Sequence, residues 1–210
     1  MQDKSLYNMN SVGVESVVST NKVLKNTYML LGMTLLFSAV TAGISMAMGL
    51  PQGAALILTL VGFGLLFVVN RMADSSKGLI AIFAFTGVMG ASIGPMLNYY
   101  LSMPGGPALV MQALGGTALV FFGLSGYALT TRKDFSYMGG FLMVGLLVAV
   151  VAMIANIFLA IPALSLTISA AVVMIMSGLI LFDTSRIING GETNYIRATV
   201  ALYLDIYNLF

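Results

Sequence analysis

Two aspartates near the C-terminal end are the residues of this chain most able to do chemistry. Asp183 follows a long apolar run, and Asp205 lies well inside another one. A carboxylate at the middle of a bilayer costs about 2.5–3.5 kcal/mol, so it needs a partner, a water-filled cavity or a bound proton. Two carboxyl groups that share a site of low dielectric titrate as a unit. The pair predicts a proton switch: its deprotonated form would attract a cation, and a shared proton would favour closure.

Both aspartates have plainer interpretations. Asp205 could be a permanently protonated side chain that hydrogen-bonds two helices, and Asp183 could be solvated at the end of its helix. Arg71, at the cytoplasmic end of the second apolar stretch, could reach Asp183 as a latch, since a cation offsets the desolvation of a buried carboxylate. Cationic side chains at helix ends, however, usually reflect only the orientation of the chain in the membrane.

Calcium is the cation that carboxylate oxygens would favour here. It takes 6–8 oxygen ligands, and few acidic side chains are at hand, so we expect any calcium site at Asp183 and Asp205 to be weak and transient. The chain has neither Cys nor His, which removes disulfides, thiolate metal sites and the usual zinc and haem ligands. We expect no cofactor, and calcium only as a permeant ion.

The composition indicates a polytopic membrane protein. The chain is 59% hydrophobic and 8% charged, with a mean hydropathy of +1.00, whereas a soluble domain carries roughly 25% charged residues. A net charge of +2 provides no dense basic stripe for nucleic acid. We therefore expect membrane lipid, and not nucleic acid, around this chain.

An intramembrane protease is the enzyme class that the sequence could suggest. Residues 123–126 (GLSG) form a GxSG, but a nucleophilic serine needs a base such as His or Lys, and the nearby Arg132 and Lys133 lie outside the apolar stretch. Two facing aspartates could imitate an aspartyl protease, but the GxGD motif usual in such enzymes is absent. We predict that the protein is not an enzyme.

Seven apolar stretches predict the helices that position these residues. A spanning helix needs about 20 mostly apolar residues; the last stretch has about sixteen before the chain stops, so we expect further residues after Phe210. The prediction is a polar tail, residues 1–25, and an all-α transmembrane domain, residues 26–210. The predicted helices cover residues 26–50, 53–70, 78–97, 107–130, 138–161, 163–182 and 195–210.

The basic residues predict the orientation of this seven-helix domain. Cytoplasmic loops carry the excess of Lys and Arg. With seven spans, all nine basic residues fall in the tail and in alternate loops, and the three other loops hold none. The N-terminus is therefore predicted to be cytoplasmic and the C-terminus to lie on the opposite side.

Small residues recur where helices could approach each other closely. We interpret this spacing as internal helix packing rather than as a dimer interface; it does not predict the oligomeric state. These residues are Gly87, Gly90, Ala91 and Gly94 in the third stretch, and Gly115, Gly116, Gly123 and Gly126 in the fourth.

Several segments resemble a known family. Residues 85–95 (FTGVMGASIGP) resemble the signature of the Bax inhibitor-1 family, also called the transmembrane Bax inhibitor motif family. Residues 118–122 (ALVFF), 130–134 (TTRKD) and 190–200 (GGETNYIRATV) look like its bacterial YccA-like branch. The similarity covers nearly the whole chain. The family's fold is a seven-helix bundle in which the other six helices surround the last, so the resemblance implies that Asp205 can approach Asp183.

The resemblance implies two activities. Members of the calcium-leak type sense pH and gate calcium through one membrane-embedded Asp in the sixth helix and one in the seventh. By position these are Asp183 and Asp205, with Arg71 as a basic latch.

Members of the YccA-like branch are described instead as substrates and modulators of FtsH, a membrane-anchored ATP-dependent protease that takes hold of a cytoplasmic N-terminal tail. Here that tail starts with Met1, Gln2, Asp3, Lys4 and Ser5, and we expect it to be an unstructured handle. The prediction is an inner-membrane protein that modulates the FtsH protease complex, with a pH-gated calcium leak as the alternative.

Overall fold

Seven α-helices make up the described part of the chain and confirm the predicted all-α fold. The computed structural model describes residues 3–210, with side chains from Thr20 onward. Six helices are long and apolar enough to cross a membrane, and α7 is short, as predicted. The helices are α1 (Asp3–Ala47), α2 (Gln52–Met72), α3 (Lys77–Leu101), α4 (Gly106–Thr131), α5 (Gly139–Leu159), α6 (Pro162–Ile188) and α7 (Tyr195–Leu209), with a 3₁₀ turn, η1 (Ser136–Met138), before α5.

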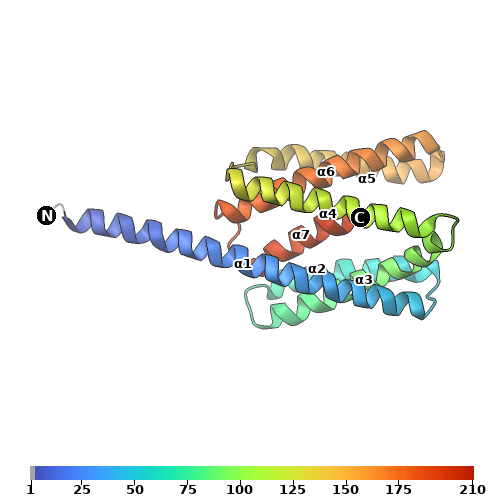
Figure 1. Cartoon of the computed structure of the whole chain (residues 1–210), viewed down its shortest axis with the longest axis horizontal. Coiled ribbons are helices and arrows are strands. Elements are labelled where there is room, and N and C mark those ends of the chain that lie inside the picture. The colour runs from blue at the N-terminus through green and yellow to red at the C-terminus, as the bar shows by residue number, and fades with distance from the viewer. Residues whose placement is uncertain (1–2) are drawn as a thin grey trace.

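The N-terminal tail is helical, and the expectation of an unstructured handle was wrong for the residues that the structure describes. α1 is a single helix of 45 residues that begins at Asp3 rather than near residue 26, and its first part projects beyond the bundle (Figure 1). Residues 3–25 contain no proline, so no residue of the type that breaks a helix most strongly separates them from the apolar span. The helix can therefore continue toward the N-terminus. Met1 and Gln2 lie outside the described residues.

The last helix lies at the centre of the bundle (Figure 1). α7 packs mainly against α6 and α1, with smaller contacts to α3 and α4. α2 packs on the outside of α3, and α5 packs on the outside of α6. Because α7 lies between these two groups of helices, its side chains can reach both of them.

α3 approaches α1 closely because glycines face the contact. A Cβ on Gly90 would collide with the backbone of Ser38, and a Cβ on Gly94 would collide with the side chain of Ser45. Internal packing of the glycines of the third helix is thus confirmed. The same expectation was wrong for the fourth helix, where a Cβ would meet nothing within 4 Å at Gly115, Gly116, Gly123 or Gly126.

Pro95 lies inside α3 and removes one backbone hydrogen bond. A proline nitrogen has no hydrogen, so the carbonyl oxygen of Ala91, four residues earlier, loses its usual partner. Ser45 on α1 donates its hydroxyl to this oxygen at 2.7 Å. Helix α1 thus supplies the hydrogen bond that the surrounding hydrocarbon cannot provide. α3 continues past Pro95 to Leu101 instead of ending near Leu97, as predicted from the sequence.

We expect Gly90→Ala to lower the free energy of unfolding by about 1–3 kcal/mol, the usual cost of overpacking, because the added methyl group meets the backbone of Ser38. Gly116→Ala is the matched control, since its methyl group has open space. Thermal unfolding of both variants in one detergent, followed by circular dichroism, measures the difference. Equal midpoints for the two variants would contradict the close approach of α1 and α3.

Candidate functional site

Asp183 and Asp205 meet inside the bundle. Asp183 lies within α6, not at its end as predicted, because α6 continues to Ile188. Asp205 lies on α7 and is only 4% exposed. The two carboxyl groups are neighbours in the interior of the bundle, close enough to affect each other electrostatically. The central position of α7 thus brings together the two aspartates that the sequence singled out.

The cationic partner of Asp183 is Arg186. Its Nη1 atom lies 3.7 Å from Asp183 Oδ1, and its Nη2 atom lies 3.9 Å from Glu192 Oε2 in the following loop. Its guanidinium group also lies over the ring of Phe182, 5.5 Å from the ring centre. Arg186 is three residues after Asp183, a spacing at which helical side chains meet. That spacing was the sequence signal for this pair.

The proposed latch, Arg71, is not paired with Asp183. It lies in the last turn of α2 and is exposed. The ion pairs among the side chains from residue 20 onward involve Arg186 and Arg197 but not Arg71. In the structure Arg186, on the same helix as Asp183, is the cation beside that carboxyl group, and a latch role for Arg71 stays a prediction.

The aspartate pair suits a proton better than a metal ion. Two ionised carboxylates have only acceptor atoms, so their contact becomes a hydrogen bond when one of them carries a proton. Asp205 Oδ2 receives no hydrogen bond from any donor in the part of the chain with described side chains. That same part contains no group of three acidic, His or Cys residues, whereas calcium takes 6–8 oxygen ligands.

The opposite face of α7 carries two tyrosines that the sequence reasoning missed. Tyr203 Oη lies 2.8 Å from Ser38 Oγ and also donates to the carbonyl oxygen of Thr86 at 3.3 Å. Tyr207 Oη lies 2.8 Å from Ser92 Oγ. The four-residue spacing of the tyrosines, which places them on one helix face, could have revealed them. They fasten α7 to α1 and α3 while Asp205 faces Asp183.

The start of α7 is fastened to the turn between α2 and α3. The Oδ1 atom of Asn194 accepts hydrogen bonds from the backbone N–H groups of Ile196 and Arg197, and so caps the helix. Its Nδ2 atom donates to the carbonyl oxygen of Ala73 at 2.9 Å and to Asp74 Oδ1 at 2.8 Å. Arg197 Nη2 donates to Asp74 Oδ2 at 2.6 Å. We call this attachment, made by Asn194, Arg197 and Asp74, the clasp. Its exposed ion pair contributes little to stability, so the N-cap formed by Asn194 is its stronger part.

Comparison with known proteins assigns the family. Residues 20–210 match the family described as "Inhibitor of apoptosis-promoting Bax1". The chain belongs to this family. It is 58% identical over 196 residues to "Modulator of FtsH protease YccA" of Escherichia coli (strain K12), which covers 93% of this chain and 89% of that relative.

Two further relatives of this Bax inhibitor family protein have no described function. An uncharacterized membrane protein of Vibrio cholerae is 51% identical over 198 residues, 94% of this chain and 89% of its own length. An uncharacterized protein of Pseudomonas aeruginosa is 45% identical over 210 residues, 100% of this chain and 94% of its own length. With its six apolar helices and a relative named an inner membrane protein, the chain is a multi-pass protein of the bacterial inner membrane.

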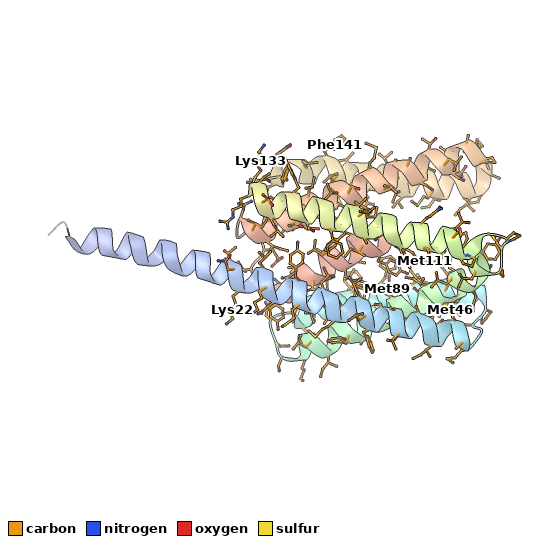
Figure 2. All side chains as sticks on the ribbon, in the orientation of Figure 1. Lys22, Met46, Met89, Met111, Lys133 and Phe141 are labelled. Atoms are coloured by element: carbon orange, nitrogen blue, oxygen red, sulfur yellow. The ribbon has the colours of Figure 1, made fainter. Side chains whose placement is uncertain are left out.

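Loops that carry basic residues lie at one end of the bundle. Figure 2 labels Lys22 on α1 and Lys133 after α4 at the end from which α1 projects. In the same turn as Lys133, Asp134 accepts hydrogen bonds from the side chain and backbone of Ser136, which lower the pKa of its carboxyl group. Asn194, before α7, donates to Ala73 and Asp74 after α2, and Ser185, near the end of α6, donates to the carbonyl oxygen of Lys133, so the turns after α2, α4 and α6 lie at the same end.

We expect Asn194→Ala to lower the free energy of unfolding by about 1 kcal/mol, the usual cost of a lost N-cap, because two backbone N–H groups and the turn after α2 lose their partner. Asn208→Ala is the control, since its exposed amide bonds only the carbonyl oxygen of Leu204 in its own helix. Thermal unfolding in detergent compares the two. A smaller effect at Asn194 than at Asn208 would contradict the clasp.

Proposed function

We propose that this protein is an inner-membrane modulator and substrate of an FtsH-type, ATP-dependent membrane protease. The observation that carries the proposal is the 58% identity, over 93% of the chain, to a relative named as a modulator of that protease. The names of the family and of this relative indicate regulation rather than catalysis. The proposed partner is the FtsH protease complex.

The projecting start of α1 is the part of the protein that the protease would hold. It extends beyond the bundle at the end that carries Lys22 and Lys133, and an excess of basic residues favours the cytoplasmic side. The handle therefore comprises residues 1–19, including the five residues from Met1 to Ser5. A helix of this length is only marginally stable outside a bundle, so a pulling protease can unwind it.

The packing of α1 suggests how a substrate can also be a modulator. Ser38 donates to the carbonyl oxygen of Thr86 at 2.7 Å, and Ser45 donates to that of Ala91 at the same distance. Both bonds are inside the bundle, where a broken bond finds no water to replace it. The projecting residues 1–19 are therefore accessible to the protease, whereas the part of α1 inside the bundle resists being pulled out of the membrane. A protease engaged on this chain is occupied and degrades other membrane proteins more slowly.

Deleting residues 2–18 should lengthen the lifetime of the protein several-fold in vesicles that contain the protease and ATP, because the handle is removed while the bundle from Thr20 onward keeps its contacts. Immunoblotting over time measures the loss of protein, and vesicles without ATP give the baseline. Turnover of the truncated protein at the wild-type rate would show that the protease does not use the start of α1.

A second candidate function is a pH-gated cation leak, which the contact between Asp183 and Asp205 favours. A proton shared by the carboxyl groups holds α6 against α7. Its loss leaves two like charges in contact, which repel each other and attract a cation. Weak binding of a permeant ion at such a site suits conduction better than storage.

If the pair is a gate, calcium flux into liposomes should be higher at about pH 8 than at about pH 5, and this difference should be lost in Asp183→Asn and in Asp205→Asn. Asp74→Asn is the control, because its carboxylate belongs to the exposed clasp. Fluorescent calcium indicators inside the liposomes report the flux.

The same variants separate the two functions. Asp205→Asn should still associate with the protease, since the handle is unchanged. A wild-type flux equal to that of empty liposomes at every pH would reject the leak and leave the protease role standing.

A further inference from the structure

A pocket of about 380 Å³ lies at the basic end of the bundle, where α1, α4 and α6 come together. Three of the candidate membrane spans begin or end there, at Thr20, Thr131 and Ile188. Figure 2 labels Lys22 and Lys133 at this end, from which α1 projects. The pocket therefore lies at the boundary between hydrocarbon and water. Its lining consists of Thr20, Asn21 and Leu24 on α1, Leu129 and Arg132 at the end of α4, and Ile188, Asn189 and Gly190 at the end of α6.

The charge of this pocket is positive. Arg132 is the one charged residue among the described side chains that line it, and it is exposed. The ion pairs among the side chains from residue 20 onward do not include Arg132. Lys22 and Lys133, which adjoin the lining in the sequence, are exposed as well. A guanidinium group presents a planar fork of N–H donors that matches two oxygens of a phosphate group, so the pocket favours a phosphate-bearing anion.

The pocket has a polar outer level and an apolar inner level. α1 runs into the bundle from this end, so Leu24 lies one turn deeper than Thr20. α4 runs out of the bundle toward this end, so Leu129 lies about one turn deeper than Arg132. At 1.5 Å per residue the two levels are about 4.5–6 Å apart. This arrangement suits an amphiphile whose phosphate lies at the outer level and whose apolar part lies at the inner one. A soluble phosphate would contact the outer level alone.

We propose that this pocket binds the head group of an anionic phospholipid, with its phosphate on Arg132. Leu24 and Leu129 contact the glycerol region, and the acyl chains remain in the surrounding bilayer. The volume of the pocket falls within the range of about 300–1,000 Å³ that is usual for small ligands. α1 and α4 are not among the helix pairs that pack extensively against each other, so the bound lipid forms a bridge between them at the base of the projecting part of α1.

Three variants that each lower the net charge by one test this site. Arg132→Gln removes the cation from the lining, and Asn21→Asp adds a carboxylate to it from a different helix. Arg71→Gln is the matched control, because Arg71 is an exposed arginine in the last turn of α2, outside the lining. Circular dichroism checks that each variant is folded. Because the two pocket variants alter different helices, the test remains decisive if one of them does not fold.

Native mass spectrometry of the full chain, with phosphatidylglycerol or phosphatidylcholine added in detergent, measures binding. Wild type and Arg71→Gln should each retain one phosphatidylglycerol, and Arg132→Gln and Asn21→Asp should retain several-fold less. Phosphatidylcholine, which has no net charge, should be retained several-fold less than phosphatidylglycerol by the wild type. Equal retention of phosphatidylglycerol in Arg132→Gln and Arg71→Gln, or of the two lipids in the wild type, would overturn the proposal.

Thermal unfolding in detergent distinguishes a lipid from a soluble phosphate. A ligand that binds only the folded protein raises the midpoint of unfolding. Phosphatidylglycerol should raise the midpoint of wild type and Arg71→Gln but not that of Arg132→Gln, whereas inorganic phosphate and glycerol 3-phosphate at the same concentration should leave the wild type unchanged. An equal rise with either soluble phosphate would overturn the assignment to a lipid, and an equal rise in Arg132→Gln would overturn the assignment to this pocket.

Discussion

Hydrocarbon offers no hydrogen-bonding partner, and this constraint determines how the bundle is held together. A polar atom inside the bundle is costly unless it is paired within the protein. Ser45 pairs with the carbonyl oxygen that Pro95 leaves free, and Ser38 links α1 to α3 and to the central helix at once. Glycines on α3 allow these short hydroxyl side chains to reach across. The position of α7 therefore depends on the contact between α1 and α3.

The central helix has two chemically different faces as a result. The tyrosine face is fully paired with α1 and α3, whereas the aspartate face leaves Asp205 Oδ2 without a donor. A proton can satisfy the aspartate face and its loss can disrupt it, but no proton transfer is needed to keep the tyrosine face in place. One helix thus combines a face whose tyrosine hydroxyls are paired with a face on which a buried carboxyl oxygen has no donor among the described side chains.

The length of the apolar stretches was enough to predict the helices, and the spacing of Gly90 and Gly94 was enough to predict close packing of α3. The partner of Asp183 was missed because the sixth helix was expected to end at Phe182, which removed the helical relation between Asp183 and Arg186. The glycines of α4 were a misleading signal, because glycine content does not say which face of a helix has a neighbour.

The unbroken α1 also determines how the molecule responds to mechanical force. The projecting start of α1 can unwind under a pull, but the covalent chain still transmits the force to the part of the helix inside the bundle, Thr20–Ala47, which is bonded to α3 and α7. The pull on this part is directed along the helix axis. It loads the bonds of Ser38 and Ser45 in shear and together, rather than peeling them apart in turn. Bonds that share a load in this way yield at a higher force, so the bundle resists traction from its N-terminal end more strongly than its thermal stability alone would indicate.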